Sequence, residues 1–150
     1  MEYIKIISSK DTFYIRQQVL RAGKPIESCQ FDGDDLPTTT HFGLFIDEKL
    51  TGVVSVFKNI NTIFNIENQY QIRGMAVLPE FQRNGLGKEL VIHCEAYLKN
   101  LKATLIWFNA RENAVLFYKK LGYNSVGAPF SIADIGIHYV MKKELATDYE

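Results

Sequence analysis

The sequence predicts one domain of mixed α/β class, built around a single sheet. Three observations carry this prediction. Short apolar runs with the spacing of strands alternate with segments that have the period of helices. The chain has 150 residues, which is the size of one domain. Hydrophobic residues make up 47% and charged residues 23%, as in ordinary globular proteins. We find no repeat or linker-like stretch, and therefore place no domain boundary within residues 1–150.

The first part of the chain predicts a strand and then a helix. Tyr3–Ser8 alternates apolar and polar residues, as a short strand does. Ser8 and Asp11 are spaced as a capping box, which indicates a helix start. The apolar residues of that helix are Phe13, Ile15, Val19 and Leu20. Ala22–Thr40 is polar and contains no clear element.

The middle of the chain predicts three strands. His41–Ile46 and Val53–Phe57 form a hairpin, and an asparagine-rich turn follows it. Tyr70–Leu78 is the third strand, and Pro79 ends it. Gly74 within this strand indicates a bulge or a close approach of another chain segment.

The last part predicts two helices and three strands. The first helix is the clearest, because one apolar face recurs at helical spacing. That face consists of Leu86, Leu90, Cys94, Tyr97, Leu98 and Leu101. The remaining elements are a strand at Ala103–Phe108, a helix at Arg111–Leu121 that ends at Gly122, and strands at Tyr123–Val126 and Ile137–Lys143. The predicted order is β-α-β-β-β-α-β-α-β-β.

Charge and composition exclude several classes of protein. Seventeen basic and 17 acidic residues give no net charge, and a nucleic-acid partner is therefore not expected. We expect no membrane span and no secretory signal, because the longest apolar stretches are short. Cys29 and Cys94 are far apart, so a reduced, cytoplasmic protein is expected. No cluster of residues has the spacing of metal ligands, and no metal is expected.

The segment 79–88 has the composition of a phosphate-binding loop. Gly85 and Gly87 lie where a strand gives way to a helix, so backbone N–H groups and the positive end of the helix dipole coincide there. Arg83 and Lys88 add full charges. The Walker pattern fails at Gln82 and Glu89, and the dinucleotide pattern GxGxxG fails because Leu90 replaces its third glycine.

What remains, Gln82-Arg83-x-Gly85-x-Gly87, resembles the pyrophosphate loop of the GNAT N-acetyltransferase superfamily. The flanking segments resemble the family in order and spacing. They are Arg73-Gly74-Met75-Ala76-Val77 before the loop and Asn109-Ala110-Arg111-x-Asn113-Ala114-x-x-Phe117-Tyr118-x-x-Leu121-Gly122-Tyr123 after it. The resemblance implies a GNAT fold, with a mixed, mostly antiparallel sheet of about six to seven strands. These strands splay apart at the acetyl-CoA site, and helices flank the sheet.

The resemblance also implies how acetyl-CoA is held as co-substrate, between the strands Tyr70–Leu78 and Ala103–Phe108. The backbone of the first strand would pair with the pantetheine arm at Met75, Ala76 and Val77, and a backbone N–H there would polarise the thioester carbonyl. The loop would hold the pyrophosphate through Gln82, Arg83, Asn84, Gly85, Leu86, Gly87 and Lys88. Asn109 and Asn113 would contact the cofactor arm.

For catalysis, the resemblance implies direct attack of an amine on the thioester, with Tyr118 donating a proton to the leaving thiolate. Some members use a glutamate before the loop as general base, but here Gln71 stands at about that place. The base is then a water chain, a residue from elsewhere, or unnecessary if the amine arrives neutral. His138 is the best side-chain candidate.

Each of these residues also has a purely structural interpretation. The two glycines would serve a tight turn alone, Tyr118 would be a core tyrosine, Asn113 a helix cap and His138 a strand histidine with satisfied hydrogen bonds. Cys94 is expected in the core. His93 is expected on the outer side of its helix, and His41 opens a strand without a catalytic role.

Charge in the segment 22–40 assigns no substrate. Asp32, Asp34 and Asp35 would attract a cationic amine, although a solvated turn around Gly33 is the simpler interpretation. Arg21 and Lys24 flank the same segment and would favour an anionic substrate.

We therefore expect transfer of an acetyl group to a primary amine, with a small molecule as the first candidate and a peptide or protein amine still open. An acyl-CoA-binding sensor without turnover is the alternative, and a nucleotide-phosphate binder is a third, weaker hypothesis. A homodimer stays open, as do the acceptor's identity, the general base and whether the acyl group is strictly acetyl.

Overall fold

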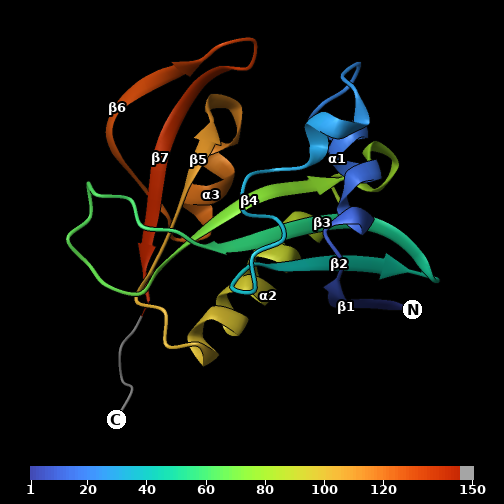
Figure 1. Cartoon of the computed structure of the whole chain (residues 1–150), viewed down its shortest axis with the longest axis horizontal. Helices are drawn as coiled ribbons and strands as arrows, with labels where there is room; N and C mark the ends of the chain where they lie inside the picture. The colour runs from blue at the N-terminus through green and yellow to red at the C-terminus, as the bar shows by residue number, and fades with distance from the viewer. Residues whose placement is uncertain (146–150) are drawn as a thin grey trace. The chain divides into compact units, whose positions relative to one another are not determined.

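A computed structural model describes residues 1–145, and its strands form one mixed sheet in the order β1-β2-β3-β4-β5-β7-β6 (Figure 1). β4 pairs with β5 in parallel, whereas β1–β2, β2–β3, β5–β7 and β6–β7 are antiparallel. The strands are β1 (Glu2–Ile7), β2 (Thr40–Ile46), β3 (Lys49–Lys58), β4 (Gln69–Val77), β5 (Leu105–Arg111), β6 (Asn124–Ile132) and β7 (Gly136–Glu144), and the α-helices are α1 (Phe13–Val19), α2 (Leu86–Asn100) and α3 (Val115–Lys120). The predicted element order and the seven-stranded, mostly antiparallel sheet are confirmed.

The chain forms two compact units. The first comprises Met1–Lys58 and Ile72–Tyr97, and the second comprises Asn59–Gln71 and the chain from Leu98 on. β4 therefore begins in the second unit, where Gln69–Gln71 pair with Leu105–Trp107 of β5. Its remaining residues belong to the first unit, and each unit is described in turn.

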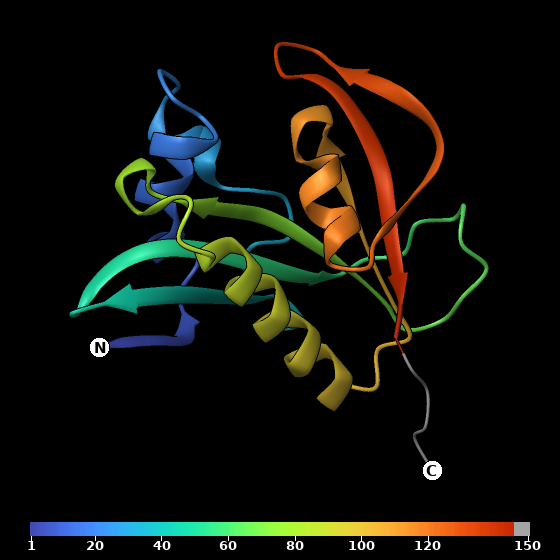
Figure 2. The same ribbon diagram turned by 180° about the vertical axis from the view of Figure 1, so that it is seen from behind.

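In the first unit, helices cover both faces of the strands. Neighbouring residues of a strand point to opposite faces, so adjacent residues of β2 contact different helices. Phe42 of β2 meets His93 and Tyr97 of α2, with ring centroids 4.8 and 5.1 Å apart. Its neighbour His41 faces the side where Arg16 of α1 lies, through Ser55 of β3. Figure 2 shows α2 crossing the strands on its own side.

The start of α1 follows the predicted capping box. The Asp11 N–H donates to Ser8 Oγ at 3.2 Å, and the Ser8 N–H donates to an Asp11 carboxylate oxygen at 3.3 Å. A short 3-10 turn, Lys10–Thr12, precedes the α-helix. Ile15 then packs with Val53, Ala76 and Leu78 in an apolar core.

The segment 22–40 differs from its prediction. It contains a 3-10 helix, Ile26–Cys29, and buries Cys29, Phe31 and Asp34. Asp34 is not part of a solvated turn, because it pairs with Arg16 inside the unit. His93 was expected on the outer side of its helix, and this is also wrong, because its ring lies edge-on against Phe42.

The second unit is built on β5, β7 and β6. Leu105 and Trp107 face a cluster that includes Phe64 from the asparagine-rich turn. The alternate residue Phe108 faces α3, where it packs against Tyr118 with ring centroids 4.4 Å apart. β6 and β7 extend beyond their predicted limits, and the predicted helix 111–121 is a 3-10 turn, Glu112–Ala114, followed by a short α3.

Two large apolar side chains near the ends of helices are exposed. Leu101 lies just after the end of α2 and is 44% exposed, although it continues the apolar spacing of that helix. Phe117 of α3 is 37% exposed. Gly122 ends α3 with φ +96°, as its predicted position required.

Candidate active site

The loop before α2 presents a row of backbone donors. Within residues 1–145, the six N–H groups of Arg83 to Lys88 have no acceptor. The next N–H, that of Glu89, donates to the carbonyl of Gly85 at 3.1 Å and begins the helical ladder. Arg83 and Gly85 have φ of +68° and +77°, and alternation of left- and right-handed conformations turns successive N–H groups toward one point. This local geometry fits an oxyanion such as a pyrophosphate.

Side chains of the loop divide into structural and exposed groups. The Gln82 amide donates to the Val77 carbonyl at 2.8 Å, and the Asn84 amide donates to the Phe81 carbonyl at 3.3 Å. Both amides therefore brace the loop against its own backbone. Arg83 and Lys88 are exposed, and Leu86 buries its side chain while leaving its N–H at the helix start. Gly87 lies in the first turn of α2.

β4 leads into this loop through Met75, Ala76 and Val77. Ala76 and Val77 are buried, and Met75 is half-buried. Gly74 just before them has φ +67°, so the backbone is locally distorted where a bulge or close approach was predicted. A Cβ at Gly74 would lie 3.1 Å from Phe31 Cε2 and 3.3 Å from Arg16 Nε, which shows that other segments approach closely.

In the second unit, three further candidates lie on β5 and the segment after it. Asn109 of β5 and Asn113 of the 3-10 turn are exposed. Tyr118 of α3 is 8% exposed and lies among the rings of Phe108, Phe117 and Tyr123. Tyr118 therefore has the packing of a core tyrosine, which fixes the orientation of its ring.

The second unit also contains Gln71, which stands at the place of the family's glutamate, and His138, the candidate general base. Gln71 is buried, and its side-chain oxygen accepts a hydrogen bond from the Asn59 amide at 2.9 Å. His138 is 5% exposed and lies 2.9 Å, through Nδ1, from the carbonyl of Gly136. A carbonyl only accepts, so Nδ1 donates this hydrogen bond, and in a neutral imidazole the lone pair is then on Nε2.

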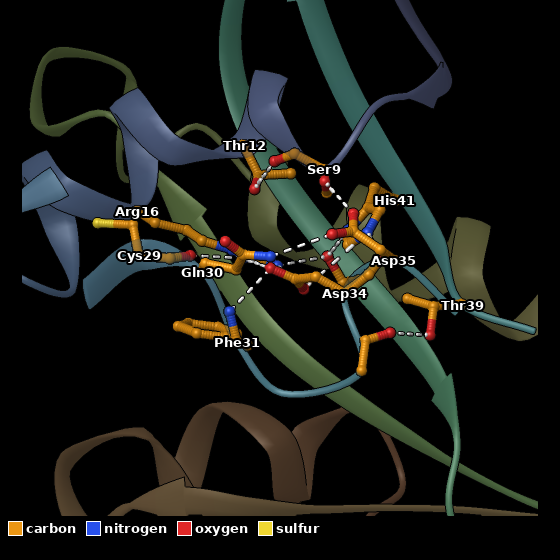
Figure 3. A network of polar contacts seen from close by, with 12 residues as sticks. Ser9, Thr12, Arg16, Cys29, Gln30, Phe31, Asp34, Asp35, Thr39 and His41 are labelled. Carbon is orange, nitrogen blue, oxygen red and sulfur yellow. Dashed lines mark hydrogen bonds and ion pairs between the residues drawn. The ribbon is translucent and has the colours of Figure 1, made fainter. Parts of the chain in front are cut away.

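A buried polar network in the first unit was missed from the sequence (Figure 3). Arg16 donates two hydrogen bonds to the Asp34 carboxylate, at 2.7 and 3.1 Å, and further bonds to the Cys29 carbonyl and Ser55 Oγ. His41 Nδ1 lies 2.6 Å from the same hydroxyl, and its Nε2 lies 2.8 Å from the Asp34 carbonyl. Arg16 Nε is the one buried side-chain polar atom of residues 1–145 without a partner.

Arg16 carried no sequence signal of burial, because its partners come from two other parts of the chain, the segment 22–40 and β3. The described residues also lack two features. In the described part of the chain, no group of three or more His, Cys, Asp or Glu residues could hold a metal ion. No helix among residues 1–145 has the length and apolar character needed to span a membrane.

Comparison with known proteins identifies the family. Residues 9–123 match the model of the acetyltransferase (GNAT) family. Over 144 residues, the chain is 35% identical to YitI, an uncharacterised N-acetyltransferase of Bacillus subtilis, and the match covers 96% of this chain and 97% of that protein.

Solved structures share the fold at low sequence identity. The ribosomal-protein-S18-alanine N-acetyltransferase of Escherichia coli is 18% identical, with a TM-score of 0.77 and coverage of 100% of this chain and 99% of that one. An aminoglycoside 6'-N-acetyltransferase, solved with coenzyme A, is 14% identical, with a TM-score of 0.75 and coverage of 95% and 96%. The chain therefore belongs to the GNAT family of acetyltransferases, and is an N-acetyltransferase with acetyl-CoA as its co-substrate.

Proposed function

We propose that the protein transfers an acetyl group from acetyl-CoA to a primary amine by direct attack in a ternary complex. The observation that carries this proposal is the row of N–H groups from Arg83 to Lys88, which have no acceptor within residues 1–145. Exposed N–H groups at the start of a helix bind an oxyanion readily, and a pyrophosphate would accept from several of them at once. The exposed Arg83 and Lys88 side chains add charge for the same group.

The proposed reaction breaks the thioester C–S bond and forms an amide C–N bond. The amine nitrogen attacks the carbonyl carbon, the sulfur leaves with the bonding electrons, and the nitrogen loses one proton. A backbone N–H near Val77 would stabilise the negative charge on the carbonyl oxygen. Met75 and Ala76 would align the pantetheine arm by strand-like pairing, and Asn109 and Asn113 are proposed as further contacts of the cofactor.

Tyr118 is the proposed proton donor to the leaving thiolate. Its ring is held by packing against Phe108 and Tyr123, so the hydroxyl has one orientation. A phenol has an ordinary pKa of about 10, which suits donation to a thiolate that needs only weak assistance. Replacing Tyr118 by Phe removes the proton and keeps the ring packing.

The proposed route for the amine proton uses His138 or water. Gln71 cannot act as a base, because a carboxamide does not take up a proton near neutral pH. His138 has a free lone pair on Nε2 when Nδ1 donates to the Gly136 carbonyl. Substitution of His138 by Gln tests this role, because kcat/KM for amines should fall if His138 is the base.

The proposal is tested by acetyl-CoA binding and by thiol release with a panel of amines. Gly85 offers a matched pair of variants, because its φ of +77° is tolerated by Asp and Asn and a Cβ there meets nothing within 4 Å. Gly85→Asp places a negative charge at the donor row, whereas Gly85→Asn differs only in charge. We expect Gly85→Asp to weaken binding far more than Gly85→Asn. Binding without thiol release on any amine would instead favour the acyl-CoA sensor.

A further inference from the structure

We propose that the acceptor amine also carries a carboxylate, and that Arg73 of β4 recognises this carboxylate with Arg21 beside it. The inference rests on the proposed acetyl transfer and names the substrate class of the same site. It makes Arg73 a specificity-determining residue.

Three guanidinium groups surround one aromatic ring in the first unit. The Cζ atoms of Arg16, Arg73 and Arg21 lie 3.9, 4.8 and 5.5 Å from the centroid of the Phe31 ring. Arg73 also lies 5.4 Å from the Phe57 ring. Phe31 and Phe57 are buried, so their rings hold the guanidinium groups by cation–π contacts and partly shield them from water.

The nearby carboxylates do not neutralise this cluster. Asp34 is the carboxylate inside it, and it is already occupied by two bonds from Arg16 and one from the Phe31 N–H. Asp35 accepts from Ser9 Oγ and from the Gln30 amide. Asp32 is exposed and acts on Arg73 only through space.

Arg73 and Arg21 are consequently left with unused donors. Neither side chain forms a hydrogen bond or ion pair with any of residues 1–145. Both are half-buried rather than fully solvated. Burial, followed by repulsion from Arg16, lowers the pKa of the Arg73 guanidinium. A folded protein that holds like charges together in this way gains when an anion joins them.

The chemistry of the missing anion follows from the guanidinium fork. Its parallel N–H groups match the two oxygens of a carboxylate, which gives a strong, directional pair. Contacts with the rings of Phe31 and Phe57 restrict the orientation of the Arg73 guanidinium group. Asp34 and Asp35 of the segment 22–40 do not pair with Arg73, because Asp34 is bonded to Arg16 and Asp35 accepts hydrogen bonds from Ser9 and Gln30. The charge ambiguity of the sequence is therefore resolved toward an anionic substrate.

The place of Arg73 on β4 connects the anion site with the reaction. Arg73 precedes Met75 by two residues, or roughly 7 Å along a strand. The proposed thioester-binding backbone begins at Met75. An amine with a carboxylate a few bonds from its nitrogen spans this distance, and both anchoring points belong to one strand of the first unit.

The test compares acceptors that differ only in the anion. Amino acids and short peptides are assayed beside their carboxamides, by thiol release at saturating acetyl-CoA. We expect kcat/KM at least about tenfold higher for the carboxylates, mainly through KM. The two sources of carboxylate separate here, because a preference confined to peptides places it on a peptide and one shared by free amino acids places it on a small molecule.

Variants then assign the preference to Arg73. Arg73→Gln should remove the preference, so that kcat/KM for carboxylates falls by about tenfold, to the value measured for carboxamides. Arg73→Lys should restore part of it, and Lys24→Gln, an exposed charge change on the same segment, should leave it intact. If Arg73→Gln does not fold, Arg73→Lys still assigns the preference, because it keeps the charge but lacks the guanidinium fork.

The two proposals fail in different ways. An enzyme that binds acetyl-CoA and acetylates carboxamides as well as carboxylates overturns the inference about Arg73 and leaves acetyl transfer standing. Absence of acetyl-CoA binding by folded protein overturns acetyl transfer, and the inference falls with it.

Discussion

Arg16 and Asp34 form an ion pair in which both side chains are 0% exposed, with Nη1 2.7 Å from Oδ2. Arg16 lies on α1, and Asp34 lies in the segment between α1 and β2. The pair joins the two, while Ser55 and His41 tie it to β3 and β2. Because a buried charge without its partner is unfavourable, this pair determines how the segment 22–40 folds onto the strands.

Asp34→Asn should destabilise the protein strongly. The substitution leaves Arg16 buried with a neutral partner, and breaking such a pair costs about 3–5 kcal/mol. The free energy of unfolding in denaturant measures the effect. Asp32→Asn is the matched control at an exposed carboxylate and should change stability by less than about 0.5 kcal/mol. Equal effects of the two variants would contradict the role given to the buried pair.

Gly74→Ala should cost more stability than Gly23→Ala. Both glycines have positive φ, +67° and +78°, so both substitutions carry backbone strain of about 1–2 kcal/mol. Only Gly74 also meets Phe31 and Arg16, whereas Gly23 has nothing within 4 Å. We expect the difference in unfolding free energy to be at least about 1 kcal/mol, from crowding. Thermal or denaturant unfolding measures this difference. A difference near zero would show that the side chains of Arg16 and Phe31 shift to make room for the added methyl group at no cost.

Tyr118→Phe should lower kcat while leaving acetyl-CoA affinity unchanged. The ring packing against Phe108 is kept, and the proton donor is lost. General acid catalysis contributes roughly 100-fold or more, so kcat should fall by about that factor. Steady-state thiol release and a calorimetric Kd separate the two quantities. Full turnover in Tyr118→Phe would return this residue to its structural role.

His93 should make stability fall as the pH falls below its ordinary pKa. His93 of α2 is partly buried against Phe42 of β2, and this burial lowers the pKa of His93 from its ordinary value of 6.5. The unfolded chain therefore binds a proton first, and the free energy of unfolding decreases from about pH 6.5 downward until the folded state also titrates. His93→Gln should flatten this slope relative to wild type between about pH 7.5 and pH 5. Identical slopes would contradict the contribution assigned to His93.

Local signals in the sequence predicted the elements well. The Ser8–Asp11 capping box has both of its hydrogen bonds, and the apolar stripe of α2 buries Leu86, Leu90 and Cys94. These features depend on residues within one or two turns of each other. Their physics is contained in a short window of sequence, so pattern and spacing suffice.

The features that were missed depend on distant partners. Arg16 is buried because it pairs with Asp34. This partner lies 18 positions away, and no periodic pattern marks it. Asp34 looks like a solvated turn residue until its neighbours are known. His93 was predicted on the outer side because the apolar spacing of α2 contains no information on the Phe42 ring of β2, which packs against it. The donor row at Arg83–Lys88 was predicted because glycine spacing is itself local.

Calorimetric titration with acetyl-CoA tests the central claim most directly. The account predicts micromolar or tighter binding, about −8 kcal/mol, by wild type. Gly85→Asn should stay near that value, and Gly85→Asp should bind at least about tenfold more weakly, because only its charge opposes the pyrophosphate. No binding by folded wild type, or equal binding by the two variants, would contradict a cofactor site at the start of α2.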